Sequence, residues 1–219
     1  MDRHPAGRDV HALRLTIRRT RSVLWCLKNS SAHLRFEKLN QELCNLGEAL
    51  GCVRELDVSI QDADCYKIDS DSLSQQRKMA RRKLRKVLNP HAIRKFERKF
   101  SRVRTAVLRC RNVSFEKARS KLMKILIEEL DRHIVGQSKH HRLRIKMKKV
   151  RYAFEVMGIA TGPIKRLQII LGGAHDLEFL QEQTGRNRKV ELDRLVFDKK
   201  AAYLIKPALR FAIHELMER

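Results

Sequence analysis

Two stretches of the chain, 10-VHALRLTIRRTR-21 and 140-HHRLRIKMKKVR-151, decide the fold. With His11 set over His141 they match without a gap, and charge and hydrophobic type agree at most positions. A second match follows each copy, 50-LGCVREL-56 with 171-LGGAHDL-177. Two matched motifs in the same order predict an internal duplication, with halves at about residues 1–112 and 113–219.

Each copy predicts an amphipathic helix that carries a row of cations beside an apolar arc. At about 100° per residue, the histidine and three cations of each copy fall within an arc of about 80°. We name these rows the first stripe, His11, Arg14, Arg18 and Arg21, and the second stripe, His141, Arg144, Lys148 and Arg151. The predicted apolar arcs are Leu13, Ile17, Thr20 and Leu24, and Leu143, Met147, Val150 and Phe154.

A single stripe of this kind is most simply explained as the solvent-facing side of a basic helix. Residues three and four apart are neighbours on a helix, so the like charges repel each other, and a bound anion would offset that repulsion. Two copies of the stripe, each led by a histidine and placed beside a core arc, favour a binding surface.

The rest of the chain is typical of an all-α protein. Glycine (9) and proline (4) are scarce, and the abundant Leu, Arg, Lys and Glu favour helices. We expect helices, to within about 2–4 residues at each end, over 9–28, 32–62, 72–88, 91–110, 114–135, 139–158, 163–183, 187–204 and 207–218. The expected caps and breaks are Asn29–Ser31, Asp71 or Ser72, Asn89-Pro90, Gly162-Pro163 and Pro207, which would end or kink a helix.

The charge of the chain predicts a polyanionic partner. There are 49 Lys and Arg against 25 Asp and Glu, a formal net charge of +24, and such a field destabilises a compact state unless an anion relieves it. Residues 75–112 contain fifteen Lys or Arg and one acid, Glu97, so this segment should border the attracting surface. Within it, 81-RRKLRK-86 fits a nuclear localisation or nucleic-acid motif, or simply a solvated helix face.

Other patterns limit the class of protein. The five cysteines have no paired metal-ligand spacing and are best explained as small buried residues in a reducing compartment. The charged N-terminus lacks the apolar segment of a secretion signal, and no apolar run approaches the ~18 residues of a membrane span. We therefore expect a soluble cytoplasmic protein without a metal site or cofactor.

Four blocks of the sequence resemble the CHAD family, the conserved histidine α-helical domain. They occupy residues 10–21, 50–58, 141–155 and 171–177, in the order that the family shows. The resemblance covers essentially the whole chain and implies a single domain of two antiparallel helical bundles related by a pseudo-twofold axis. It also implies a function: binding inorganic polyphosphate in a basic groove or pore between the two halves, often at polyphosphate granules.

The same resemblance implies which residues bind polyphosphate. The family's histidine and basic positions carry over to His11, Arg14, Arg18, Arg19, Arg21, Arg54, His141, Arg144, Lys148, Lys149 and Arg151. Arg19 and Lys149 lie off the arc of the stripes and are weaker candidates for contact. Two positions depart from the family pattern: Glu55 replaces the usual aspartate, and His175 replaces a small polar residue.

These residue types suit a linear phosphate polymer, which offers only closely spaced anionic oxygens. Arginine gives bidentate hydrogen bonds to phosphate, lysine a point charge, and histidine a donor that can become protonated beside an anion. We therefore predict tighter binding below neutral pH. Each histidine could equally be a packing residue bonded to a backbone carbonyl.

The acids beside the Leu-Gly steps, Glu55, Asp57 and Asp176, invite a catalytic interpretation, but we expect them to orient arginines of the first helix or to cap helices. Glu155 should orient Arg151, one turn away, or Lys148, two turns away. The chain has no E-x-E or phosphate-loop motif, so we expect no catalysis. The main alternative is a helical nucleic-acid-binding protein, which the charge permits although few aromatic residues are available for base stacking.

Overall fold

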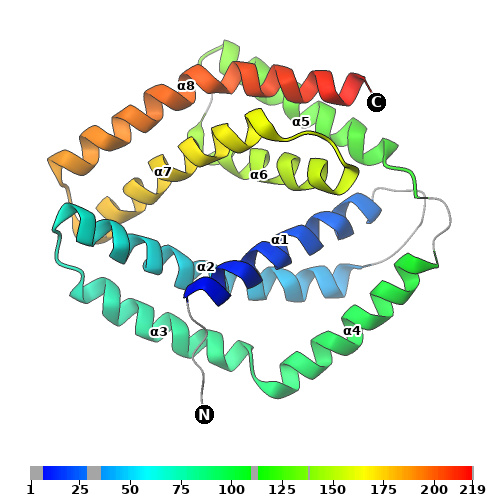
Figure 1. Ribbon diagram of the computed structural model, residues 1–219, viewed down its shortest axis with the longest axis horizontal. Helices are drawn as coiled ribbons and strands as arrows, with labels where there is room; N and C mark the ends of the chain where they lie inside the picture. The colour runs from blue at the N-terminus through cyan, green and yellow to red at the C-terminus, as the bar shows by residue number, and fades with distance from the viewer. Residues whose placement is uncertain (1–6, 29–35, 110–112, 138, 219) are drawn as a thin grey trace. The chain divides into compact units, whose positions relative to one another are not determined.

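The protein is all-α, as predicted. The computed structural model describes residues 7–28, 36–109, 113–137 and 139–218. Within these ranges it contains eight helices and no strand (Figure 1). They are α1 (Gly7–Lys28), α2 (Glu37–Tyr66), α3 (Asp71–Val87), α4 (Pro90–Leu108), α5 (Glu116–Ile134), α6 (His140–Met157), α7 (Gly162–Thr184) and α8 (Arg188–Met217). The chain forms two compact units, Met1–Ser114 and Phe115–Arg219, each described by itself below.

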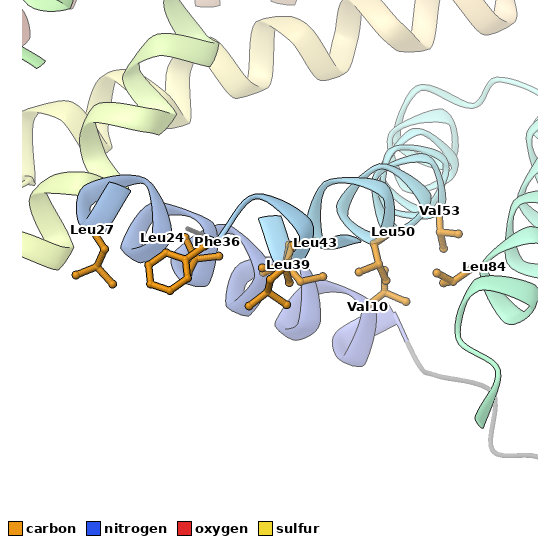
Figure 2. Packing of buried hydrophobic residues seen from close by; sticks show 10 residues of the cluster. Val10, Leu24, Leu27, Phe36, Leu39, Leu43, Leu50, Val53 and Leu84 are labelled. Carbon is orange, nitrogen blue, oxygen red and sulfur yellow. The ribbon is translucent and has the colours of Figure 1, made fainter. Parts of the chain in front are cut away.

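In the first unit, α2 is the central helix and packs against both α1 and α3. The core cluster takes a row of apolar side chains from α1 and another from α2, and one buried leucine from α3 (Figure 2). Its buried members include Val10, Ile17 and Leu24 of α1, Leu39, Leu43, Leu50 and Val53 of α2, and Leu84 of α3. The predicted arc of α1 is right for Ile17 and Leu24, but Leu13 is exposed, and Val10 lies in the core instead.

The basic segment of the first unit forms α3 and α4, which are held to α2 by ion pairs. Asp57 of α2 lies 3.6 Å from Arg77 and 3.3 Å from Arg81 of α3, and Glu42 of α2 pairs with Lys99 of α4. No described residue of α4 is fully buried; one apolar edge of this helix packs on the core, and its cations other than half-buried Lys99 are exposed.

In the second unit, α8 packs against α7 and α5, and α6 packs against α7. The apolar arc predicted for α6 is fully buried: Leu143, Met147, Val150 and Phe154 are 0 % exposed. Gly173 permits the close approach of α7 to α8, since a Cβ atom there would lie 2.7 Å from the Phe197 ring.

A buried carboxylate, Glu129 of α5, fixes the other side of α6. Its Oε1 accepts from Arg132 at 2.6 Å, and lies 2.9 Å from Lys146 Nζ and 3.6 Å from Arg142 Nε. Burial raises the pKa of Glu129, but the hydrogen bonds from Lys146 and Arg132 outweigh it, so its pKa lies below the ordinary value. Arg142 and Lys146 thus form ion pairs with Glu129, and they do not belong to the second stripe, although they lie on the same helix.

Some predicted boundaries are wrong. Pro207 does not end a helix: α8 runs through it as one helix, so the described residues hold eight helices where nine were predicted. Proline removes one backbone donor, and here Pro207 is exposed while Ile205 and Ala208 beside it are buried, so packing holds the helix together. α2 continues to Tyr66, four residues beyond its predicted end and therefore at the limit of the expected precision.

The predicted helix caps have mixed outcomes. Pro90 and Pro163 lie in the first turns of α4 and α7, as predicted, and Asn89 caps α4 by accepting from the Ala92 N–H at 2.9 Å. Asp71 begins α3 instead of capping it, and its N–H donates to Asp69 at 3.1 Å. The predicted cap at residues 29–31 lies outside the described residues.

Candidate anion-binding sites

The first stripe lies along an open groove between α1 and α2. Three of its members, Arg14, Arg18 and Arg21, line a depression of about 380 Å³ together with Ile17. The α2 side of the groove is formed by Cys44, Gly47, Glu48, Gly51, Cys52 and Glu55. Because the two helices share a core, their backbones fix the spacing of these arginines.

Arg14 is held in place by the Leu-Gly step that the sequence duplicates. Its Nη1 donates to the Leu50 carbonyl at 3.4 Å, and its Nη2 lies 3.7 Å from Glu55 Oε1. A Cβ atom on Gly51 would lie only 3.1 Å from that same Nη1. Gly51 therefore makes room for the guanidinium, and Glu55 orients an arginine of the first helix as predicted.

Arg21 is positioned by a residue that the sequence analysis missed. Its Nε donates to Asn40 Oδ1 at 3.3 Å. Asn40 is near the start of α2, far from either matched motif, so only the pairing of the helices brings it to the stripe. Arg18, between Arg14 and Arg21, is half-buried on the groove wall.

The other residues predicted for the first half lie away from the groove wall. His11 and Arg19 are exposed on α1. Arg54 lies near Asp62 on α2: burial raises the pKa of Asp62, and the charge of Arg54 acts against that rise. The prediction that Asp57 orients first-helix arginines is wrong, because α3 rather than α1 covers this part of α2 and supplies Arg77 and Arg81.

In the second unit, the second stripe faces His175 of α7. The imidazole rings of His141 and His175 are 5.4 Å apart between centroids and inclined at 58°. Burial, and after it the charges of Arg144, His141 and Lys148, together lower the pKa of His175 to about 4. His175 is thus neutral at pH 7 and sits where these cations of α6 converge.

Arg151, the last member of the second stripe, is fixed by three groups. Its Nε donates to Glu155 at 2.9 Å, its Nη1 donates to Gln168 of α7 at 3.1 Å, and its guanidinium carbon lies 5.2 Å from the Tyr152 ring centroid. The prediction that Glu155 orients Arg151 is confirmed, whereas buried Gln168 carried no signal in the sequence. Lys149 is exposed on the outer side of α6.

The two Leu-Gly steps differ in their surroundings. A Cβ on Gly51 would crowd Arg14, whereas a Cβ on Gly172 would meet no atom within 4 Å among the described residues. In α7 it is the next residue, Gly173, at which an added Cβ would be too close to another side chain, the Phe197 ring of α8. The sequence match at this step therefore does not carry over to an equal arrangement of side chains.

Other candidate chemistry is sparse in the part of the chain that the structure describes. It holds no cluster of three or more His, Cys, Asp or Glu side chains suited to a metal ion. None of its helices is long and apolar enough to cross a membrane. Its four cysteines are free thiols; Cys26 is buried as predicted, but Cys52 and Cys65 are exposed.

Eight helices and two rows of cations set beside helix–helix contacts define a basic all-α protein. The chain belongs to the CHAD domain family, whose pattern matches residues 2–185 of its 219 residues. All four motif blocks lie within the match, which ends at Gly185, before α8 begins at Arg188. No curated protein and no solved structure matches the chain significantly.

Proposed function

We propose that the protein binds inorganic polyphosphate without catalysis, on the first stripe along the α1–α2 groove and on the second stripe beside α7. The observation that carries this proposal is the row of Arg14, Arg18 and Arg21 on one groove wall. Membership of the CHAD domain family supports the same ligand. Residence at cytoplasmic polyphosphate granules is part of the proposal, and a fluorescent fusion that stays diffuse in granule-containing cells would contradict it.

The arrangement of the first stripe fits a repeating anion. Successive stripe positions are three or four residues apart, so their Cβ atoms follow one another along the helix at about 5–6 Å. Each planar guanidinium can bond two oxygens of a phosphate, and a chain of phosphates can meet several in turn. Bound phosphate would also offset the mutual repulsion of the arginines.

One observation favours nucleic acid as a second candidate ligand. The outer side of α4 exposes Arg94, Arg98 and Arg102 at successive turns, and the last two border a shallow depression with Ser101 and Thr105. Such a face can bind any phosphate backbone through charge. At physiological salt, we expect long-chain polyphosphate to displace duplex DNA or RNA from the protein, and efficient displacement in the opposite direction would favour nucleic acid as the ligand.

Two cysteines on α2 offer a direct test of the groove. Cys52 lines the groove and is exposed, whereas Cys65 is exposed near the far end of the same helix. We expect polyphosphate to slow alkylation of Cys52, measured by mass spectrometry of its peptide, and to leave Cys65 unaffected. Equal rates for Cys52 with and without bound polyphosphate would contradict binding in this groove.

The non-catalytic part of the proposal has its own assay. We expect no phosphate release when the protein is incubated with polyphosphate and Mg²⁺ or Mn²⁺. Turnover that disappears in Glu55→Gln or Asp176→Asn would show instead that the protein is an enzyme.

A further inference from the structure

His175 has an imidazole nitrogen that is buried without a hydrogen-bond partner among the described residues. Its side chain is 19 % exposed, and its Nδ1 atom is fully buried and has no hydrogen-bond partner among the described residues. Burying a polar nitrogen without a partner is unfavourable. The remaining, partly exposed edge of this ring, which lies 5.4 Å from the His141 ring, is where a ligand could supply a hydrogen bond.

The charged groups around His175 are mostly cations. From α6 it is faced by His141, Arg144 and Lys148. On its own helix the Glu178 carboxylate is 3.9 Å from Nδ1, and Arg194 of α8 lies 3.8 Å from the same carboxylate. Since Glu178 is shared with Arg194, the balance at His175 stays positive.

We propose that His175 is the proton-accepting member of an oxyanion site that it forms with His141 and Arg144, so that binding of a phosphate group there protonates His175. The proposal rests on the proposed function, because it assigns this residue to the polyphosphate site on the second stripe. It adds a contact from α7 and a regulatory consequence: binding in the second unit consumes a proton.

The physical reason is charge compensation. Without an anion, burial and the cations of α6 keep His175 neutral, with a pKa of about 4. An oxyanion bound at the part of the His175 ring that solvent reaches would place negative charge beside these cations and accept a hydrogen bond from His175, which favours the protonated ring. Linkage is reciprocal: an anion that raises the pKa of His175 binds more tightly as the pH falls.

The size of the effect follows from this linkage. If bound phosphate returns the pKa of His175 to its ordinary value near 6.5, affinity should rise about tenfold between pH 7.5 and pH 5.5 through this residue alone. Long polyphosphate is the suitable probe, because its internal phosphates keep one charge each over this range and so add no proton uptake of their own.

The test is calorimetric titration with long-chain polyphosphate at pH 6, in two buffers of different ionisation enthalpy, which counts the protons taken up. We expect uptake by the wild-type protein that falls by about half a proton or more in His175→Asn. His214→Asn is the matched control, because His214 is an exposed histidine of the same unit, and it should behave as wild type. When the pH falls from 7.5 to 5.5, the affinity of His175→Asn for polyphosphate should rise about tenfold less than the affinity of the wild-type protein.

A second measurement does not depend on a variant. The imidazole resonances of His175 in isotope-labelled wild-type protein should report a pKa near 4 in the free state and a clearly higher pKa with polyphosphate bound. Binding that is intact but causes no change at His175, or proton uptake equal in His175→Asn and wild type, would overturn this inference alone. Failure of the wild-type protein to bind polyphosphate would instead overturn the proposed function, and this inference with it.

Discussion

Gly51→Ala should stabilise the protein and yet weaken polyphosphate binding. Gly51 lies within α2, where alanine is favoured over glycine by about 0.8–1.0 kcal/mol in a helix interior. The added Cβ would lie 3.1 Å from Arg14 Nη1, tighter than ordinary contact, so the guanidinium must move by a few tenths of an ångström. Because its contact with the Leu50 carbonyl is already 3.4 Å long, that shift would release Arg14 from its position.

The loss of affinity can be bounded from this geometry. A hydrogen bond to a charged group contributes about 1.5–3 kcal/mol when fully made, and a displaced guanidinium keeps part of it. We expect the dissociation constant for polyphosphate to increase about three- to tenfold, equivalent to a loss of about 0.6–1.4 kcal/mol in binding free energy. The assay is calorimetric or fluorescence titration with polyphosphate, alongside thermal unfolding.

Gly47→Ala is the matched control for this prediction. Gly47 is one turn earlier on α2 and also lines the groove, but a Cβ there would meet only Ile17 Cγ2, at an ordinary 3.5 Å. It should gain the same helix stability and change affinity less than twofold. Equal affinities for both variants, or a destabilised Gly51→Ala protein, would refute the reasoning about Arg14.

Three further predictions concern stability. Glu129→Gln should lower the free energy of unfolding by about 2–4 kcal/mol, because it removes the carboxylate that lies between Arg132, Arg142 and Lys146. Denaturant unfolding measures this loss, and a change below about 1 kcal/mol would contradict the prediction. Asp57→Asn should cost about 1–2 kcal/mol and loosen α3, seen as faster amide exchange confined to that helix. As the pH falls from 6.5 to about 4, the unfolded chain binds a proton at His175 that the folded protein does not, so stability should drop by up to about 3 kcal/mol, and less in His175→Asn.

The stripes could be predicted from the sequence because helical periodicity alone places residues three and four apart on one face. The apolar arc of α6 was predicted for the same reason, and each member is buried. The pairing of Glu155 with Arg151 followed from their spacing on one helix. These are local relations, which the rotation per residue determines.

The partners from other helices could not be predicted in this way. Asn40 and Gln168 reach Arg21 and Arg151 only because α2 lies beside α1 and α7 beside α6. The continuity of α8 through Pro207 likewise depends on packing, which here outweighs the loss of one backbone hydrogen bond. Asp57 was assigned to the wrong helix because two helices compete for its side of α2.

The most direct test of the account is whether polyphosphate affinity depends on the position of the cations or only on their number. The triple variant Arg14→Gln, Arg18→Gln, Arg21→Gln and the charge-matched triple variant Arg94→Gln, Arg98→Gln, Arg102→Gln each remove three charges, the first from the groove and the second from the exposed face of α4. With both shown to be folded by circular dichroism, we expect the first to bind long-chain polyphosphate about 100-fold more weakly than wild type and the second less than about threefold more weakly. Equal losses in the two variants would contradict a specific site on the first stripe.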